Sequence, residues 1–114
     1  MATEAKVGVI AAKGGSFLIE DRAPDEVFTP EDFSEEQVMI GETADEFMLK
    51  EVVPRLPALL KLDYELSREL LRKAGELGFM GIEVPEQYGG AGLDPISFCV
   101  VMEEIAAADA AHST

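Results

Sequence analysis

The stretch that decides the fold of this chain is ELLRKAGELGFMGIEVPEQYGGAGLD, residues 69–94. Around its first half, apolar residues recur at helical spacing; they are Leu66, Leu70, Ala74 and Leu77, with Leu71 beside them. Gly78 follows in the position of a left-handed C-cap, and Phe79 stands where the accompanying hydrophobic contact is expected. We therefore predict a helix from about Asp63 to Leu77.

The second half, Gly81 to Leu93, is predicted to be a structured loop. Pro85 and the glycines at 89, 90 and 92 disfavour a helix and permit backbone angles that are closed to other residues. A glycine cluster of this kind can also cradle phosphate, but no Lys-Ser/Thr pair follows it and no strand–helix unit surrounds it. A tight connection between helices is the prediction.

Immediately after the loop, Asp94-Pro95 opens another predicted helix, with Asp94 as N-cap and the proline at the first helical position. Residues 96 to 102 make it apolar on nearly every side, so we expect it to be buried on several faces. An alanine-rich continuation runs from Ile105 to Ala111. Between these segments lie Glu103 and Glu104, which point about 100° apart and make a poor acid–base pair.

Upstream of the quoted stretch, Ser34 to Gln37 has the pattern of a helix-capping box. One side of the helix that follows carries Ile40, Ala44, Phe47, Met48 and Glu51 at spacings of three and four. This side is predicted to face the core up to the last turn. Pro54 is predicted to end the helix.

The first 33 residues have a different character. Glycines break any early periodicity, and Phe17-Leu18-Ile19 is the main apolar cluster before a turn-rich stretch from Asp21 to Pro30. We interpret residues 1–33 as an extended arm whose apolar patch docks on another surface. A loosely ordered chain end is the alternative.

Composition narrows the class of protein. The chain has 114 residues, 9 Lys and Arg against 23 Asp and Glu, and a net charge of −14. Such a charge argues against binding nucleic acid and anionic membrane surfaces. The segment from residue 20 to 51 holds 12 acids but only Arg22 and Lys50 as cations, which is typical of a solvated helix face.

The sequence contains few of the cysteine and histidine residues that usually act as nucleophiles or metal ligands. Cys99 is the single cysteine and His112 the single histidine, so neither an internal disulfide nor a Cys/His zinc site is expected, and no metal site is predicted. Neither forms an evident nucleophile–base pair. No membrane-spanning segment or signal peptide is apparent, and we predict a cytoplasmic protein. Composition and periodicity alone favour an acidic helical interaction module.

The quoted stretch resembles the signature of acyl-CoA dehydrogenases. In that family a helix ending in Glu-Leu-Gly precedes Gly-Ile-x-x-Pro-Glu-x-Tyr-Gly-Gly-x-Gly, matched here by residues 76–78 and 81–92. The resemblance continues into the Glu-Glu-Ile-Ala run at 103–106, and residues 47–54 resemble the end of the family's first helix. It covers about residues 34–114. The arm from residue 14 to 33 resembles the N-terminal extension of the very-long-chain branch.

This resemblance implies an all-α fold, the N-terminal helical domain of a flavoenzyme that converts an acyl-CoA to its trans-2-enoyl-CoA with FAD as cofactor. Electrons then pass to electron-transferring flavoprotein, and the complete enzyme is expected to be a homo-oligomer. The resemblance places the catalytic base and most FAD contacts in a β domain and a C-terminal bundle that this chain lacks. We therefore expect no catalytic or cofactor-binding residue in the chain, and no turnover or tight FAD binding by the chain alone.

Two roles are implied residue by residue. Ser113 and Thr114 align with the start of the acyl-tail pocket. An apolar docking site for electron-transferring flavoprotein aligns with Ile40, Phe47, Phe79, Leu93 and Val101, with Glu51 at its rim. Plain helix packing is the alternative for these apolar residues. A free-standing acidic interaction module without catalytic activity is the alternative for the whole chain.

Overall fold

A computed structural model describes residues 15–109 and contains no β-strand within them. The chain divides into two compact units, Met1–Phe33 and Ser34–Thr114. In the first, the described residues form three short 3-10 turns, Ser16–Leu18, Pro24–Glu26 and Pro30–Asp32. Phe17, Leu18 and Ile19 are exposed there. The predicted extended arm contains these turns as well as extended backbone, which is found at Ala23, Val27, Thr29 and Phe33.

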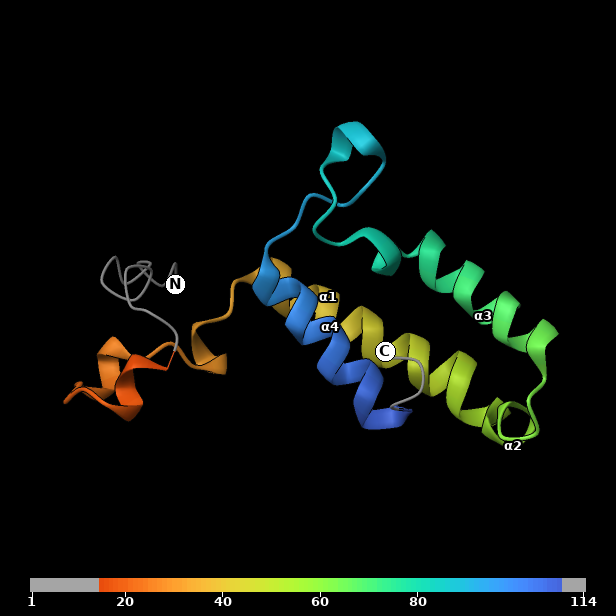
Figure 1. Cartoon of the computed structure of the whole chain (residues 1–114), viewed down its shortest axis with the longest axis horizontal. Coiled ribbons are helices and arrows are strands. Elements are labelled where there is room, and N and C mark those ends of the chain that lie inside the picture. The colour runs from red at the N-terminus through yellow and green to blue at the C-terminus, as the bar shows by residue number, and fades with distance from the viewer. Residues whose placement is uncertain (1–14, 110–114) are drawn as a thin grey trace. The chain divides into compact units, whose positions relative to one another are not determined.

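The second unit is a small helical assembly (Figure 1). Helix α1 spans Glu35–Phe47 and α4 spans Pro95–Ala108; they pack side by side and run in the same direction. Helix α3, Tyr64–Glu76, runs in the opposite direction. The all-α prediction is confirmed for the part of the chain that the structure describes.

The predicted N-caps of α1 and α4 and the predicted C-cap of α3 are confirmed, and the structure adds an N-cap at Asp63. Ser34 Oγ accepts from the Gln37 N–H at 3.2 Å while Gln37 Oε1 accepts from the Ser34 N–H at 2.9 Å. Asp63 accepts from the Leu66 N–H, and Asp94 accepts from the Ser97 N–H. Helix α3 ends before Gly78, whose φ of 87° is the left-handed angle expected of that C-cap.

One hydrophobic core holds the helices together. Its buried members are Ala44, Phe47, Met48, Val52, Leu70, Ala74, Phe79, Ile82, Val101 and Ile105. Helices α1 and α4 approach closely at Gly41, where a Cβ would lie 2.7 Å from Val100 Cγ1. The predicted inward side of α1 is confirmed up to Met48, but Leu77 and Leu71 of the second stripe are exposed. Leu77 is the C-cap residue of α3.

The prediction that Pro54 ends the first helix is wrong. The backbone continues from α1 through a π-helical turn, Met48–Val52, a 3-10 turn, Val53–Arg55, and the short helix α2, Leu56–Leu59. A proline lacks an N–H and its ring clashes with the carbonyl four residues earlier. The wider turn, with Val53 N–H bonded to the Met48 carbonyl, lets the chain pass the proline without stopping.

Helix α4 is buried on fewer sides than its sequence predicts. Ser97, Val100, Val101 and Ile105 are buried, whereas Phe98 is 40% exposed and Cys99 is exposed. The helix packs against α1 and against the π-helical turn that continues α1, and these contacts cover one side of it. The predicted continuation from Ile105 is helical as far as Ala108, and the backbone of Asp109 is extended, so the helix ends earlier than predicted; residues 110–111 lie outside the described residues.

Candidate functional site

Three of the predicted docking residues belong to the core. Phe47, from the end of α1, meets Phe79 edge to face with ring centroids 6.0 Å apart. Phe47 is 8% exposed, Phe79 is 5% exposed, and Val101 on α4 has no exposed surface. All three side chains therefore pack within the helical unit, and Val101 exposes no surface to a partner in this structure.

The other predicted docking residues lie at the border of the core. Ile40 and Leu93 are partly buried and pack against the core cluster. Glu51 is half-buried on the π-helical turn. A partner can reach these three positions, so the docking hypothesis continues to rest on them.

Glu51 is part of a four-charge cluster that sequence reasoning missed. Its Oε2 accepts from Lys73 Nζ at 2.7 Å and lies 3.3 Å from Arg55 Nη2. Glu69 Oε1 lies 3.0 Å from Arg55 Nη1 and 3.3 Å from Lys73 Nζ. Two acids and two bases therefore tie the turn around Pro54 to α3. The pairs within each segment have helical spacing, but the partnership between segments had no sequence signal.

The same contacts set the protonation of the cluster. The hydrogen bond from Lys73 lowers the pKa of Glu51, and the hydrogen bonds from Arg55 and Lys73 lower the pKa of Glu69. The hydrogen bonds to Glu51 and Glu69 raise the pKa of Lys73. These shifts favour the charged forms of Glu51, Glu69 and Lys73, so Glu51 already has a cationic partner within the domain.

A second network joins the N-termini of α1 and α4. Gln37, which is 8% exposed, donates from Nε2 to Asp94 Oδ2 at 3.1 Å, while Asp94 Oδ1 accepts from the Ser97 N–H at 2.7 Å. Burial works to raise the pKa of Asp94, but the hydrogen bonds from Ser97 and Gln37 outweigh it and the pKa is lowered. One glutamine thus serves the caps of two helices.

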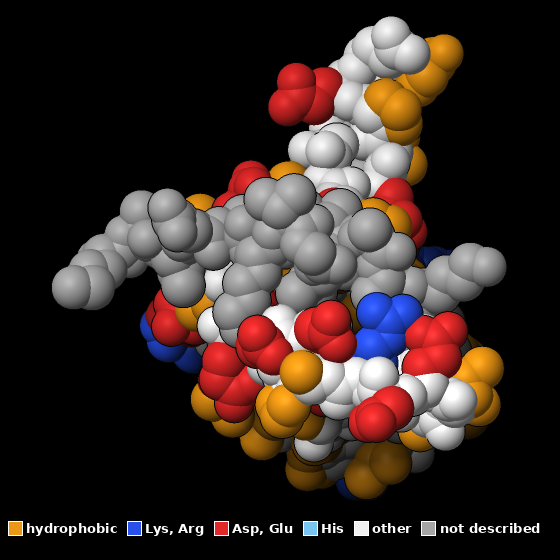
Figure 2. All heavy atoms as spheres, turned by 90° about the vertical axis from the view of Figure 1, so that its left-hand side faces the viewer, with side chains coloured by type: hydrophobic (Ala, Val, Ile, Leu, Met, Phe, Trp, Pro, Cys, Tyr) orange, Lys and Arg blue, Asp and Glu red, His pale blue; other side chains and the backbone are white. Residues whose placement is uncertain are grey.

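The surface is acidic. Figure 2 shows Asp and Glu side chains spread over the face in view, with Lys and Arg side chains at only a few places. Across residues 15–109 no three His, Cys, Asp or Glu side chains are grouped to hold a metal ion. No helix in that range is long and apolar enough to cross a membrane. The predicted pocket residues Ser113 and Thr114, and also His112, lie outside the described range.

Comparison with known proteins identifies the family. The family model described as acyl-CoA dehydrogenase, N-terminal domain, matches residues 34–114. A probable acyl-CoA dehydrogenase of Bacillus subtilis (strain 168) is 44% identical over 104 residues, which is 91% of this chain and 18% of that protein. The chain belongs to the acyl-CoA dehydrogenase family.

Solved structures agree with this assignment. The acyl-CoA dehydrogenase of Bacillus anthracis, solved in complex with FAD, matches 86% of this chain with a TM-score of 0.77 and 48% identity. A chain in the structure of the electron transferring flavoprotein of Acidaminococcus fermentans matches 75% with a TM-score of 0.65 and 36% identity. This chain spans 17% and 22% of those two chains.

The helix N-termini and the glycine-rich loop of the described residues offer a flavin dinucleotide no cationic donor. Lys and Arg side chains and free helix N-termini are common donors to a pyrophosphate. The N-termini of α1, α3 and α4 are capped by Ser34, Asp63 and Asp94. The glycine-rich loop holds Glu83 and Glu86 but no Lys or Arg. No step of a flavin reaction is therefore assigned to residues 15–109.

Proposed function

We propose that this chain is the N-terminal helical domain of an FAD-dependent acyl-CoA dehydrogenase, with residues 1–33 as an arm that precedes the domain at 34–114. The enzyme dehydrogenates an acyl-CoA to the trans-2-enoyl-CoA and passes electrons to electron-transferring flavoprotein. The observation that carries the proposal is the match of residues 34–114 to the family's N-terminal domain. Similarity to the Bacillus subtilis relative covers 104 residues, so it extends into the arm.

The activity of the complete enzyme tests this proposal. The enzyme that contains this domain should purify with a flavin absorption band that is bleached by an acyl-CoA, and the free acid should leave the band unchanged. The 114-residue chain alone should carry no flavin and no activity. A full enzyme whose flavin does not respond to any acyl-CoA across a series of chain lengths would contradict the proposal.

The domain is proposed to contribute to substrate and partner binding and to supply no catalytic residue. Ser113 and Thr114 are proposed to begin the wall of the acyl-tail pocket. Ile40, Leu93 and Glu51 are proposed as the accessible part of the docking surface for electron-transferring flavoprotein, with Phe47, Phe79 and Val101 behind them as the packed floor. A small apolar anchor with a charged rim suits a transient redox partner.

Variants of the docking border can separate partner binding from chemistry. Leu93→Ala in the complete enzyme should raise the KM for electron-transferring flavoprotein relative to the KM for a small dye acceptor. Leu60→Ala, an exposed leucine just beyond α2, is the matched control. If both variants change the two KM values alike, these border residues do not dock the partner.

We also propose that the enzyme is a cytoplasmic homo-oligomer. The free thiol of Cys99 is exposed, which suits a reducing compartment. Cell fractionation tests the location, and light scattering of the complete enzyme tests the assembly.

A further inference from the structure

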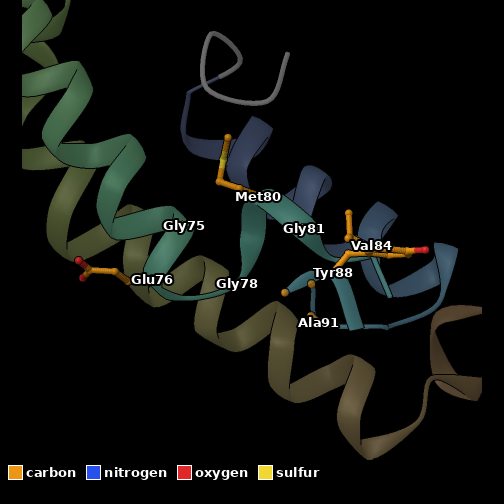
Figure 3. A pocket seen from close by; sticks show the side chains of 10 residues that line it. Gly75, Glu76, Gly78, Met80, Gly81, Val84, Tyr88 and Ala91 are labelled. Carbon is orange, nitrogen blue, oxygen red and sulfur yellow. The ribbon is translucent and has the colours of Figure 1, made fainter. Parts of the chain in front are cut away.

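A groove that the proposed function does not use lies between the C-terminal end of α3 and the glycine-rich loop (Figure 3). It has a volume of about 490 Å³. Much of its wall is backbone, because it is lined by Gly75, Gly78, Gly81, Gly89 and Gly90. The side chains that matter for its chemistry are Glu76, Met80 and Tyr88.

The loop side of the groove is held in place by its own hydrogen bonds. The N–H groups of Ala91, Gly92 and Leu93 donate to the carbonyls of Gly81, Val84 and Ile82 at 2.8–2.9 Å. At Gly90 a Cβ would lie 2.0 Å from the Val84 carbonyl oxygen, so the two arms of the loop touch through backbone. A loop closed in this way presents a preformed surface, which reduces the entropy lost on binding.

The electrostatics of the groove favour a cation. Helix α3 ends at Glu76, and the C-terminal end of a helix carries the negative end of its dipole. Arg72 lies one turn before Glu76, but no ion pair forms between them. Lys73 is the last Lys or Arg in the sequence, and it is paired with Glu51 and Glu69. Residues 74–114 hold seven acids and no Lys or Arg.

Two large side chains that line the groove are highly exposed to solvent. Tyr88 is 75% exposed and Met80 is 66% exposed. An exposed aromatic ring on a rigid loop is the kind of residue that dominates protein interfaces, and its face attracts cations. In Figure 3 the Glu76 carboxylate and the Tyr88 hydroxyl point away from each other at the two sides of the groove, so an occupant that meets both must be longer than one side chain.

We propose that this groove binds a basic, arginine-containing segment of a partner protein, with a guanidinium stacked on Tyr88 and a second cation near Glu76. Arginine fits better than lysine because its planar guanidinium stacks on an aromatic ring. An anionic occupant is disfavoured by the charges at the groove, and a second copy of this chain is disfavoured by its net charge of −14. The proposal is independent of the dehydrogenase function.

A peptide titration tests the proposal directly. The 114-residue chain is titrated with acetyl-Gly-Arg-Gly-Arg-Gly-amide, and backbone amide shifts are followed by NMR. The same peptide with citrulline in place of arginine is the neutral control of equal shape. The arginine peptide should shift the amides of the glycines that line the groove, added salt should weaken binding, and the citrulline peptide should shift these amides little.

Variants locate the contact. Tyr88→Leu should weaken binding about two- to five-fold, the range of an exposed cation–π contact. Tyr64→Leu is the matched control, since Tyr64 is 67% exposed at the other end of α3. Glu76→Gln should weaken binding by a similar factor, and Glu103→Gln, an exposed acid on α4, should not. Tyr88→Phe keeps the ring and should keep the affinity, which separates stacking from a structural defect.

Several outcomes would overturn the proposal. Equal binding of the citrulline peptide would show that charge is not recognised. Shifts outside the groove, or no shifts at all, would place the peptide elsewhere or nowhere. A loss of affinity in Tyr88→Phe as large as in Tyr88→Leu would exclude stacking, and equal losses in the control variants would exclude the groove.

Discussion

The core of the helical unit and the glycine-rich loop reach a defined structure by opposite means. The core around Phe47, Met48 and Val101 is filled by side chains that exclude water. In the loop, Gly90 touches Val84 through backbone, and there is no space for a Cβ. The core is stabilised by burial of large apolar side chains, whereas the loop requires a glycine because a side chain at position 90 would not fit. Different substitutions should therefore damage each region.

The largest expected effect is in the core. Phe47→Ala should lower the free energy of unfolding by about 3–5 kcal/mol, because it removes a ring packed against Phe79 and leaves a cavity. Urea unfolding followed by circular dichroism measures the change. Phe98→Ala, at a ring that is 40% exposed, should cost much less. Equal losses would mean that the outer side of α4 is also core, as its sequence suggests.

The next largest effect is expected in the glycine-rich loop, where a larger side chain should lower the free energy of unfolding. Gly90→Ala should cost about 1–3 kcal/mol, because the new Cβ would meet the Val84 carbonyl. The matched control is Gly75→Ala within α3, where the Cβ meets only Met80 Cγ at 3.6 Å. That variant should be neutral or more stable by up to about 1 kcal/mol. If both alanines are tolerated equally, backbone contact does not define the loop.

A smaller effect is expected where loop and core meet, at the cap of α4. Asp94→Ala should cost about 0.5–2 kcal/mol, the usual range for losing an N-cap. Asp63→Ala removes the corresponding cap of α3, whose carboxylate accepts from Leu66 N–H within its own helix. Since Asp94 also accepts from Gln37 on α1, its loss should be the larger of the two. In the background of Gln37→Ala the difference should vanish.

The smallest effect is expected from the four-charge cluster, and it should depend on pH. The pKa values of Glu51 and Glu69 are lowered from 4.5, so their contribution is complete above that value and is lost as the pH falls through the lower folded-state values. The pKa of Lys73 is raised from 10.5, so its contribution is lost as the pH rises through the higher folded-state value. Glu51→Gln should slightly lower the thermal midpoint at pH 7. A thermal midpoint whose dependence on acid pH is the same in that variant as in the wild type would contradict the role of Glu51.

Local features were well predicted from the sequence because their causes are local. The predicted caps at Ser34 and Asp94 each depend on a side chain and an N–H three residues later. The left-handed Gly78 also follows from its position after α3. The prediction at Pro54 was wrong because the π-helical turn that accommodates this proline has no distinctive residue pattern.

The candidate site was harder to predict from the sequence. An apolar stripe indicates that residues such as Phe47 and Val101 lie against another apolar surface. It does not indicate whether that surface belongs to the core of the domain or to a partner protein. The partners of Glu51 on α3 were also hidden, because Lys73 is 22 residues away and the two meet only when the helices pack.

The sequence by itself therefore determined the helices, their caps, the glycine-rich connection and the family. The helices, their caps and the loop depend on residues that are close in sequence, and the family is indicated by a motif that can be read from the sequence alone. Only the tertiary structure decided which apolar residues are core, how the chain passes Pro54, and that a groove opens between Glu76 and Tyr88. Each of these depends on contacts between segments that are distant in sequence, and apolar side chains carry no directional signal that would specify such contacts in advance.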